Sequence, residues 1–285
     1  MSAVEPPLTL INGRPALALP VTDRGLLYGD GLFETVAVRA RQPCLWARHL
    51  ARLQRGCARL AIASPDATLL GDEVEVLLAG APAPDGVLKV VVTRGSGPRG
   101  YAPPALPTPT RILTFAAGLP GPVFAAEDGI RLTLCETRLG DNVRLAGVKH
   151  LNRLEQVLAR AEWSDPAVHD GIMCDHHGRA ICCTAANLFA VFQDGIVTPA
   201  LDRCGVAGTV REVVREHAAA LGIGFIERAL PLPELLGADG LFISNALLGV
   251  LPVERVRDRY FDSAAIPATL LERVRKAALE PETPA

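Results

Sequence analysis

The segment VLKVVVT, residues 87–93, constrains the fold more than any other, because it is β-branched and nearly uncharged. Such a composition favours a strand in the middle of a sheet. Two helical stretches, Trp46 to Ala63 and Asp66 to Leu78, come before it, and the other strand-like segments nearby are LTLING, VAVRA and RILTF. The first half of the chain therefore predicts a sheet combined with two helices.

The second half contains more strands than helices. Its strand-like segments are IRLTLC, GIMCDHHGRAICC, NLFAVF, GIVTP and LFISNALLGVLPV, and the second of these reads as two strands around a His-Gly turn. The segment TVREVVREHAAALG, which begins at Thr209, has apolar residues at helical spacing. Pro267 could begin a last helix, from Ala268 to Ala278. This half therefore predicts a β-rich domain with helices.

A segment rich in Gly and Pro, residues 116–129, separates the two halves and carries no periodic apolar stripe. We therefore expect an α+β chain of two domains. The expected boundaries are a small N-terminal α/β domain over residues 1–115, a linker over 116–126, and a larger, β-rich C-terminal domain over 127–285.

The chain of 285 residues has a net charge of −2, and 49% of its residues are hydrophobic. This balance predicts a globular protein and gives no electrostatic reason to bind nucleic acid or an acidic membrane surface. The longest segment without a charged residue, 112–126, has 15 residues and is too short to cross a bilayer. The N-terminal segment MSAVEPPLTLING lacks the features of a signal peptide, so we expect a cytoplasmic protein.

The seven cysteines are expected to be reduced and buried, as is usual in a cytoplasmic chain. A cluster of possible metal ligands does occur, and it consists of Cys174, His176, His177, Cys182 and Cys183. It contains no CxxC pair, and a turn followed by a core strand explains it better than a zinc site. We therefore expect no metal.

Lys149 lies in the segment AGVKHLNRLEQVLAR, residues 146–160, where a strand or loop precedes a helix. Asn152 and Glu155 resemble a capping box, which predicts that the helix begins just after the lysine. An apolar stripe is expected to pack on one face, and it consists of Leu151, Leu154, Val157 or Leu158, and Ala161. Lys149 is then either a lysine that extends from a helix end into solvent, or a partly buried amine that is a good nucleophile.

Four other segments contain residues that could bind a ligand. They are LDRCGVAGTVRE (201–212), HLARLQR (49–55), TDRGLLYGDGLFET (22–35) and VTRGSGPRGYAPP (92–104). The first provides a flexible entry to a helix N-terminus, which suits a phosphate. Arg52 and Arg55 in the second, taken alone, are better explained as a solvated basic face. The last two are loops of the kind that carry binding residues.

Together these segments supply an amine, a phosphate cradle and cations for a carboxylate. Pyridoxal phosphate requires such a set, because its aldehyde reacts with a lysine and its phosphate favours a helix N-terminus. The residues alone therefore suggest this cofactor.

Seven segments along the chain form a recognisable series: YGDGLFET, HLARL, LKVVVTRGSGPRGY, LAGVKHLNRLEQVLAR, CCTAANLF, GVAGTVR and ISNALLGVLPV. In this order they resemble the 4-amino-4-deoxychorismate lyases of the fold-type-IV pyridoxal phosphate enzymes. The resemblance runs from about Leu10 to Val253. The segments RGSGPRGY and KHLNRLEQ are more specific to the lyases than to the related aminotransferases.

The resemblance implies pyridoxal 5'-phosphate as the cofactor and Lys149 as the lysine that links covalently to it. It also implies that Arg52 and the backbone amides of Thr209 and Val210 bind the phosphate. The loop beside the cofactor and the substrate is matched by Ser244, Asn245 and Ala246. A homodimer with its pockets near the interface is implied as well.

One position departs from the family pattern. The family has a glutamate seven residues before the Phe of NLF, where it holds the ring nitrogen of the cofactor in its protonated form. Counting back from Phe189 gives Cys182 in this chain. A neutral thiol is a poor partner for a pyridinium, so the electron sink should be weaker. Transamination should suffer more than an elimination that is driven by formation of an aromatic ring.

The implied reaction converts 4-amino-4-deoxychorismate to 4-aminobenzoate and pyruvate, a step of folate biosynthesis. Lys149 would act as the general base, and no amino acceptor would be consumed. The candidates for binding the substrate are Arg99, Tyr101 and Asn245, with Tyr28 lining the pocket. Two alternatives are an aminotransferase of the same fold for D-alanine or branched-chain amino acids, and a non-catalytic homologue that serves as a binding module.

Overall fold

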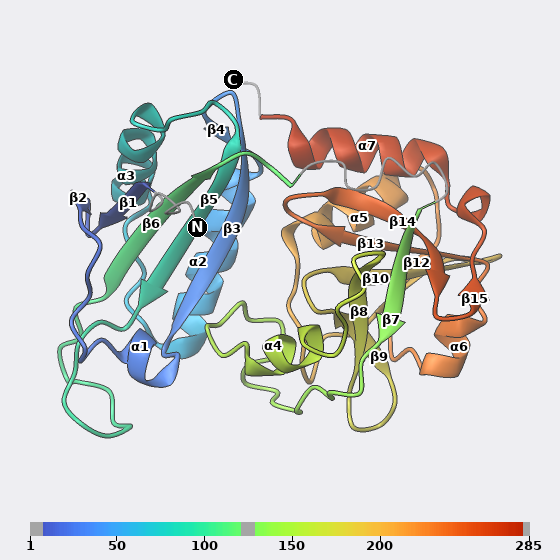
Figure 1. The fold of residues 1–285 in the computed structure, drawn as a ribbon, viewed down its shortest axis with the longest axis horizontal. Helices are drawn as coiled ribbons and strands as arrows, with labels where there is room; N and C mark the ends of the chain where they lie inside the picture. The colour runs from blue at the N-terminus through green and yellow to red at the C-terminus, as the bar shows by residue number, and fades with distance from the viewer. Residues whose placement is uncertain (1–7, 121–128, 282–285) are drawn as a thin grey trace. The chain divides into compact units, whose positions relative to one another are not determined.

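The computed structural model describes residues 8–120 and 129–281. The chain divides into two compact units (Figure 1). Unit 1 consists of residues 1–121, 149–152 and 280–285, and unit 2 of residues 122–148 and 153–279. The short segment Lys149–Asn152 therefore belongs with the N-terminal residues, although it lies in the middle of the sequence.

Unit 1 contains an antiparallel sheet of six strands in the order β2-β1-β6-β5-β3-β4. The strands are β1 (Leu8–Ile11), β2 (Arg14–Pro15), β3 (Gly31–Arg39), β4 (Gln42–Pro43), β5 (Gly86–Thr93) and β6 (Thr110–Ala117). The predicted central position of VLKVVVT is confirmed, because β5 lies between β3 and β6. Alternate side chains of β5 are fully buried, namely Leu88, Val90 and Val92.

Three helices complete the described part of unit 1: α1 (Arg24–Tyr28), α2 (Trp46–Leu60) and α3 (Ala67–Ala79). Helix α2 packs on β3, and α3 packs on β6 and β1. A Cβ on Gly56 of α2 would lie 2.9 Å from a methyl carbon of Leu32, so this glycine allows the close approach of α2 to β3. Helix α2 ends three residues before the predicted Ala63, because Ala61 adopts a left-handed conformation.

Unit 2 contains, in its described residues, a sheet of nine strands in which β7 pairs in parallel with β14 and β8. The strands are β7 (Ile130–Leu134), β8 (Val168–Cys174), β9 (Ala180–Cys183), β10 (Asn187–Phe192), β11 (Gly195–Pro199), β12 (Phe225–Arg228), β13 (Gly240–Asn245), β14 (Gly249–Val256) and β15 (Arg259–Tyr260). The predicted turn between two strands in GIMCDHHGRAICC is confirmed by β8 and β9. Phe189 and Phe242 stack in its core, with ring centroids 4.6 Å apart.

The helices of unit 2 are α4 (Leu154–Arg160), α5 (Thr209–Ala220), α6 (Leu232–Leu236) and α7 (Ala268–Leu279), with a 3₁₀ turn at Ser263–Ala265. Helix α5 packs against α7 and β13, and α7 packs against β14. The predicted helices at residues 209 and 268 are confirmed. The predicted α+β class is therefore correct.

The predicted start of the helix after Lys149 is wrong. Helix α4 begins at Leu154, five residues after the lysine. The capping box does not form, because the side chain of Asn152 donates to the carbonyl of Gly29 (3.1 Å) and Glu155 accepts from the amide of Gly140 (2.8 Å). Contacts with residues distant in the sequence therefore replace the local cap.

The predicted packing of the apolar stripe is also wrong for the single chain. Leu154, Val157 and Leu158 are 76%, 60% and 61% exposed, and among the residues of α4 only Ala159 is buried. Helix α4 thus presents an apolar face to solvent.

The proposed linker, residues 116–126, overlaps the end of β6 at Ala117. Its residues 121–126 lie outside the described part of the chain. The domain boundaries of residues 1–115 and 127–285 stay a prediction. In the described ranges, no helix is both long enough and apolar enough to cross a membrane.

Candidate functional site

Lys149 is held against β3 by backbone hydrogen bonds. Its carbonyl accepts from the amide of Phe33 (3.1 Å), and the amide of Leu151 donates to the carbonyl of Gly31 (3.0 Å). The ammonium of Lys149 lies 4.2 Å from the centroid of the Phe33 ring. Lys149 is half-buried rather than extended into solvent, which favours the second of the two roles predicted for it.

A buried cluster of charged and polar groups surrounds Arg52, and it consists of Glu34 on β3 with His49 and Arg52 on α2. The carboxylate of Glu34 accepts from Arg52 Nε (2.9 Å), from a second guanidinium nitrogen of Arg52, and from His49 Nδ1 (2.7 Å). The three side chains are 1%, 1% and 8% exposed in chain order. The alternative of a solvated basic face is therefore wrong for Arg52, although Arg55 is exposed.

The cluster sets the charge of its members. Burial opposes ionisation of Glu34, but Arg52 and His49 outweigh it and lower the pKa of Glu34 to about 2. Burial lowers the pKa of His49, and the charges of Arg52 and Lys149 act in the same direction. The imidazole is therefore neutral near pH 7 and donates from Nδ1 to a charged carboxylate. Glu34 thus orients Arg52 through two hydrogen bonds.

The N-terminus of α5 is shaped by Gly208 and by the side chain of Asn187. Gly208 precedes Thr209, and within the described residues the helix has no side-chain cap. The first amides of a helix lack internal partners, so those of Thr209 and Val210 are available to an anion. A Cβ on Gly208 would lie 2.0 Å from the side-chain oxygen of Asn187, whose nitrogen donates to the carbonyl of Val206 (2.8 Å). Asn187 therefore holds the loop that enters the helix.

Ser244 lies opposite Asn187 in the pairing of β13 with β10. It is 2% exposed, and its hydroxyl finds no hydrogen-bond partner among the residues that the structure describes. The side chain of Asn245 accepts from the amides of Leu247 (3.0 Å) and Leu248 (2.9 Å), so it shapes the turn that follows β13. A buried hydroxyl without a partner is costly, and a bound ligand would satisfy it.

Cys182 lies on β9, opposite Met173 of β8. Its side chain packs in an apolar cluster that includes Cys135, Leu139 and Cys204. Burial raises the pKa of the Cys182 thiol, with the charge of Asp170 adding to the effect, so the thiol is neutral. All seven cysteines, which lie within the described ranges, are free and buried, as predicted. In the same ranges, no group of three His, Cys, Asp or Glu residues could hold a metal ion.

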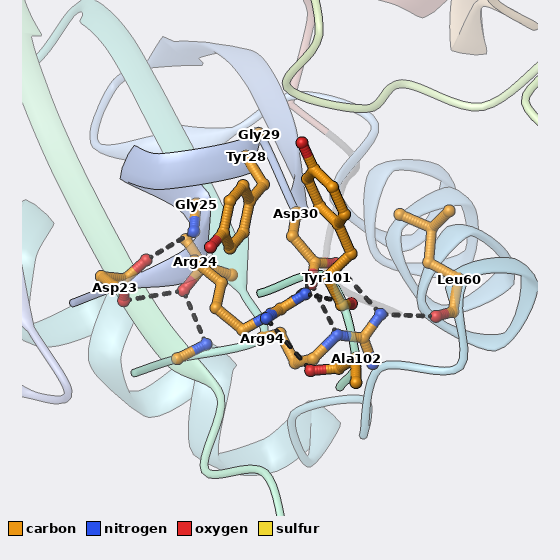
Figure 2. A network of polar contacts seen from close by, with 12 residues as sticks. Asp23, Arg24, Gly25, Tyr28, Gly29, Asp30, Leu60, Arg94, Tyr101 and Ala102 are labelled. Atoms are coloured by element: carbon orange, nitrogen blue, oxygen red, sulfur yellow. Dashed lines mark hydrogen bonds and ion pairs between the residues drawn. The ribbon is translucent and has the colours of Figure 1, made fainter. Parts of the chain in front are cut away.

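Tyr28 and Tyr101 lie side by side, with ring centroids 5.4 Å apart (Figure 2). The hydroxyl of Tyr28 accepts from the amide of Gly100 (3.2 Å). Arg99 is exposed, and Tyr101 is 85% exposed. The structure therefore brings together Tyr28 and Tyr101, two of the residues predicted to bind the substrate, and Arg99 precedes the Gly100 amide that Tyr28 binds. Asn245 belongs to unit 2.

Comparison with known proteins places the chain in a family. The family model described as amino-transferase class IV matches residues 31–256. This chain is a member of that family. It is 36% identical to the aminodeoxychorismate lyase of Vibrio harveyi over 248 residues, which cover 86% of this chain and 90% of that protein. It is also 32% identical to a putative branched-chain-amino-acid aminotransferase of Methanocaldococcus jannaschii, over 86% of this chain and 85% of that protein.

Solved structures of the class IV family agree with the fold. The chain superposes on the crystal structure of 4-amino-4-deoxychorismate lyase from Pseudomonas aeruginosa with a TM-score of 0.86 and 45% sequence identity. The match covers 94% of this chain and 97% of that one. The predicted fold-type-IV architecture is therefore confirmed.

The residues fit the pyridoxal phosphate that the class IV family implies. An uncapped helix N-terminus and an unsatisfied buried hydroxyl in unit 2 suit a phosphate. In unit 1, the buried Arg52 is the predicted phosphate ligand, and the half-buried Lys149 is the predicted reactive amine. These observations come from this chain and not from its relatives.

The sequence interpretation missed Glu34, His49 and Arg24. Glu34 and His49 lie in segments that were singled out, YGDGLFET and HLARL, but neither was assigned a role. The spacing of His49 and Arg52 by three residues on one helix would have placed them on a common face. Arg24 carries no such local signal, because the carbonyls that it binds lie more than 70 residues away.

Proposed function

We propose that this chain is a pyridoxal phosphate-dependent lyase that converts 4-amino-4-deoxychorismate to 4-aminobenzoate and pyruvate. The observation that carries the proposal is the likeness to two aminodeoxychorismate lyases, from Vibrio harveyi and Pseudomonas aeruginosa, over most of both chains. A half-buried lysine, a buried arginine, and a helix N-terminus without a side-chain cap among the described residues support it.

We assign the following residues to the cofactor. Arg52 binds the phosphate as a guanidinium held by Glu34, and the amides of Thr209 and Val210 bind it at the N-terminus of α5. The hydroxyl of Ser244 and the turn at Asn245 contact the cofactor, and Cys182 lies where related enzymes have a glutamate. When bound, the cofactor supplies an aldehyde that links to an amine and a ring that accepts electrons.

Lys149 carries the proton in this reaction. Its neutral amine takes the proton from ring C4 of the substrate, and the electron pair of that C–H bond forms the new ring double bond as the C3–O bond breaks. Lys149 then returns a proton to the enolpyruvate that leaves, which becomes pyruvate. Aromatisation of the product ring drives the step, so no amino acceptor is consumed.

The thiol of Cys182 suits this elimination better than transamination. A neutral, buried thiol cannot hold a positive charge on a ring nitrogen as a carboxylate does. Transamination depends on a long-lived carbanion, whereas the elimination gains its driving force from the substrate. Cys182 therefore favours a lyase with poor transaminase side activity.

The substrate carboxylates are assigned to Arg99, Tyr101 and Asn245, and Tyr28 lines the pocket. Arg99 is an exposed cation, and a guanidinium pairs well with a carboxylate. Tyr28 and Tyr101 provide aromatic surface and hydroxyls beside it.

One experiment separates the possible functions. The purified holoenzyme is incubated with 4-amino-4-deoxychorismate without any 2-oxo acid, and 4-aminobenzoate and pyruvate are measured. Equal amounts of both products are expected. Turnover that requires a 2-oxo acid acceptor, with D-alanine or a branched-chain amino acid as donor, would make the chain an aminotransferase. Cofactor binding without either reaction would make it a non-catalytic homologue.

We also propose a homodimer in the cytoplasm. The exposed face of α4 formed by Leu154, Val157 and Leu158 is the kind of apolar surface that a second copy of the chain covers. Seven free, buried cysteines suit a reducing compartment.

A further inference from the structure

Arg24, the first residue of α1, is a buried arginine whose guanidinium contacts a loop far along the chain. It is 3% exposed. Its Nη1 atom donates to the carbonyls of Gly100 (3.0 Å) and Ala102 (3.3 Å), and its Nη2 atom donates to the carbonyl of Tyr101 (2.9 Å). One side chain therefore binds three successive peptide groups. Figure 2 shows Arg24 with two of them, Tyr101 and Ala102.

Asp30 anchors the other edge of this guanidinium. Its carboxylate accepts one hydrogen bond from Arg24 Nε (2.8 Å). It accepts two more from Arg94, from Nε (2.8 Å) and from Nη2 (3.0 Å). Arg94 also donates to the carbonyls of Leu60 (2.8 Å) and Ala61 (2.7 Å), at the end of α2. Burial opposes ionisation of Asp30, but the two arginines outweigh it and lower its pKa. Arg24 is thus fixed to a charged, well-anchored partner.

Aromatic contacts hold the same loop from the side of α1. The guanidinium carbon of Arg24 lies 4.9 Å from the centroid of the Tyr28 ring, and that ring packs on Tyr101. The hydroxyl of Tyr28 accepts from the amide of Gly100 (3.2 Å). The peptide groups from Gly100 to Ala102 are therefore fixed through both their carbonyls and an amide.

The held segment includes Tyr101 and directly follows Arg99. Both side chains are exposed, although the backbone beside them is bound to a buried residue. A loop that contains two glycines and three prolines within residues 97–104 has no regular hydrogen-bonded structure of its own to hold it. The buried guanidinium of Arg24 thus orders the backbone of residues 100–102, while the side chains of Arg99 and Tyr101 stay exposed to a ligand.

We propose that Arg24 is a positioning residue that presents Arg99 and Tyr101 to the carboxylates of the substrate. This inference rests on the proposed function, which assigns those two residues to substrate binding. It requires an arginine, because a lysine ammonium is a single point charge and cannot reach Asp30 and three carbonyls at once.

The first test measures the order of the loop without using activity. Trypsin cleaves after Arg99, and the new N-terminus at Gly100 identifies this cut by mass spectrometry. Arg24→Lys should be cut after Arg99 about tenfold faster than the unmodified chain, as expected for the loss of about one hydrogen bond from a charged donor. An unchanged rate would overturn the proposal.

The matched control is Arg111→Lys. Arg111 is another arginine of unit 1, partly buried, whose guanidinium donates two hydrogen bonds to a carboxylate. Its Nε and Nη2 atoms lie 3.1 Å and 2.6 Å from Oε1 of Glu73. Its guanidinium binds Glu73 of α3 and not a carbonyl of the loop, so cleavage after Arg99 should stay at the unmodified rate. Equal acceleration in both variants would show general loosening and would contradict the proposal. If Arg24→Lys does not fold, Arg24→Gln, which keeps one donor group, replaces it.

The second test measures substrate binding in the holoenzyme. Arg24→Lys should raise KM for 4-amino-4-deoxychorismate about tenfold, with kcat and the dissociation constant of the cofactor nearly unchanged. A fall in kcat with KM unchanged would exclude the positioning role. If the unmodified enzyme lacks lyase activity, the proposed function fails, while the trypsin test still decides whether Arg24 holds the loop.

Discussion

At the scale of single residues, Lys149 is the side chain on which the proposed chemistry depends. Replacing Lys149 with Ala should lower turnover by at least about 10²- to 10⁴-fold, because the general base is lost. The covalent link to the cofactor should be lost with it. Borohydride reduction of the holoenzyme, followed by peptide mapping, should place the label on Lys149.

Lys89 provides the matched control for this prediction. Its ammonium also lies near the Phe33 ring, 5.5 Å from the centroid. Lys89→Ala should keep both the label on Lys149 and the activity. Label on Lys89 or Lys276 in the unmodified enzyme would contradict the assignment.

Glu34 gives a residue-scale prediction about pH. Its pKa falls from 4.5 to about 2 in the folded chain, so its ion pair stabilises the fold above about pH 4.5 and is lost as the pH falls toward about 2. The contribution is of the order of 3 kcal/mol. Glu34→Gln should therefore destabilise the chain near pH 7, and the difference in unfolding free energy should shrink below about pH 4.

The same variant should weaken the binding of pyridoxal phosphate about tenfold, because Arg52 loses the carboxylate that orients it. Denaturant unfolding at several pH values and a cofactor titration measure the two effects. A constant stability difference from pH 7 to pH 3 would mean that Glu34 is not the titrating group.

Cys182→Glu tests the departure from the family pattern. If the thiol faces the ring nitrogen, the new carboxylate should raise transamination of D-alanine while the elimination rate changes little. Thermal destabilisation without any gain of transamination would instead identify Cys182 as a plain core thiol, because a buried unpaired charge is costly.

At the scale of elements, the entry to α5 depends on Gly208. In Gly208→Ala the new Cβ would lie 2.0 Å from the side-chain oxygen of Asn187, so the loop that enters α5 must move away from Asn187. We expect cofactor affinity to fall about tenfold or more, since the amides of Thr209 and Val210 would lose their position. A fluorescence titration with pyridoxal phosphate measures the change.

Gly71→Ala is the control for this element-scale prediction. Gly71 lies inside α3, and a Cβ there would meet no described atom within 4 Å. The substitution should leave cofactor affinity unchanged and stabilise the chain by about 0.4–1 kcal/mol. Equal loss of affinity in both variants would argue against a specific role of Gly208.

At the scale of the whole molecule, the exposed face of α4 predicts association. Leu158→Glu should shift the protein from dimer to monomer in sedimentation velocity, because a charge would be buried in the apolar interface. Val76→Glu on α3 is the control, since Val76 is similarly exposed, at 63%. A monomeric unmodified protein, or a dimer that tolerates Leu158→Glu, would refute the proposed interface.

The sequence by itself determined most of the elements and the family. VLKVVVT, the His-Gly turn and the helix at Thr209 were predictable because β-branched runs, turn residues and helical spacing act over a few neighbouring residues. The motifs around Lys149, Arg52 and Gly208 were recognisable for the same reason, because each is a short continuous segment.

Only the tertiary structure decided how those segments are used. The capping box at Asn152 failed because its two side chains found partners at Gly29 and Gly140, and local propensity is weaker than such contacts. Glu34 lies 18 residues from Arg52, and Arg24 lies 76 residues from Gly100. Hydrogen bonds over these separations depend on strand order and helix packing, which no local pattern of residues contains.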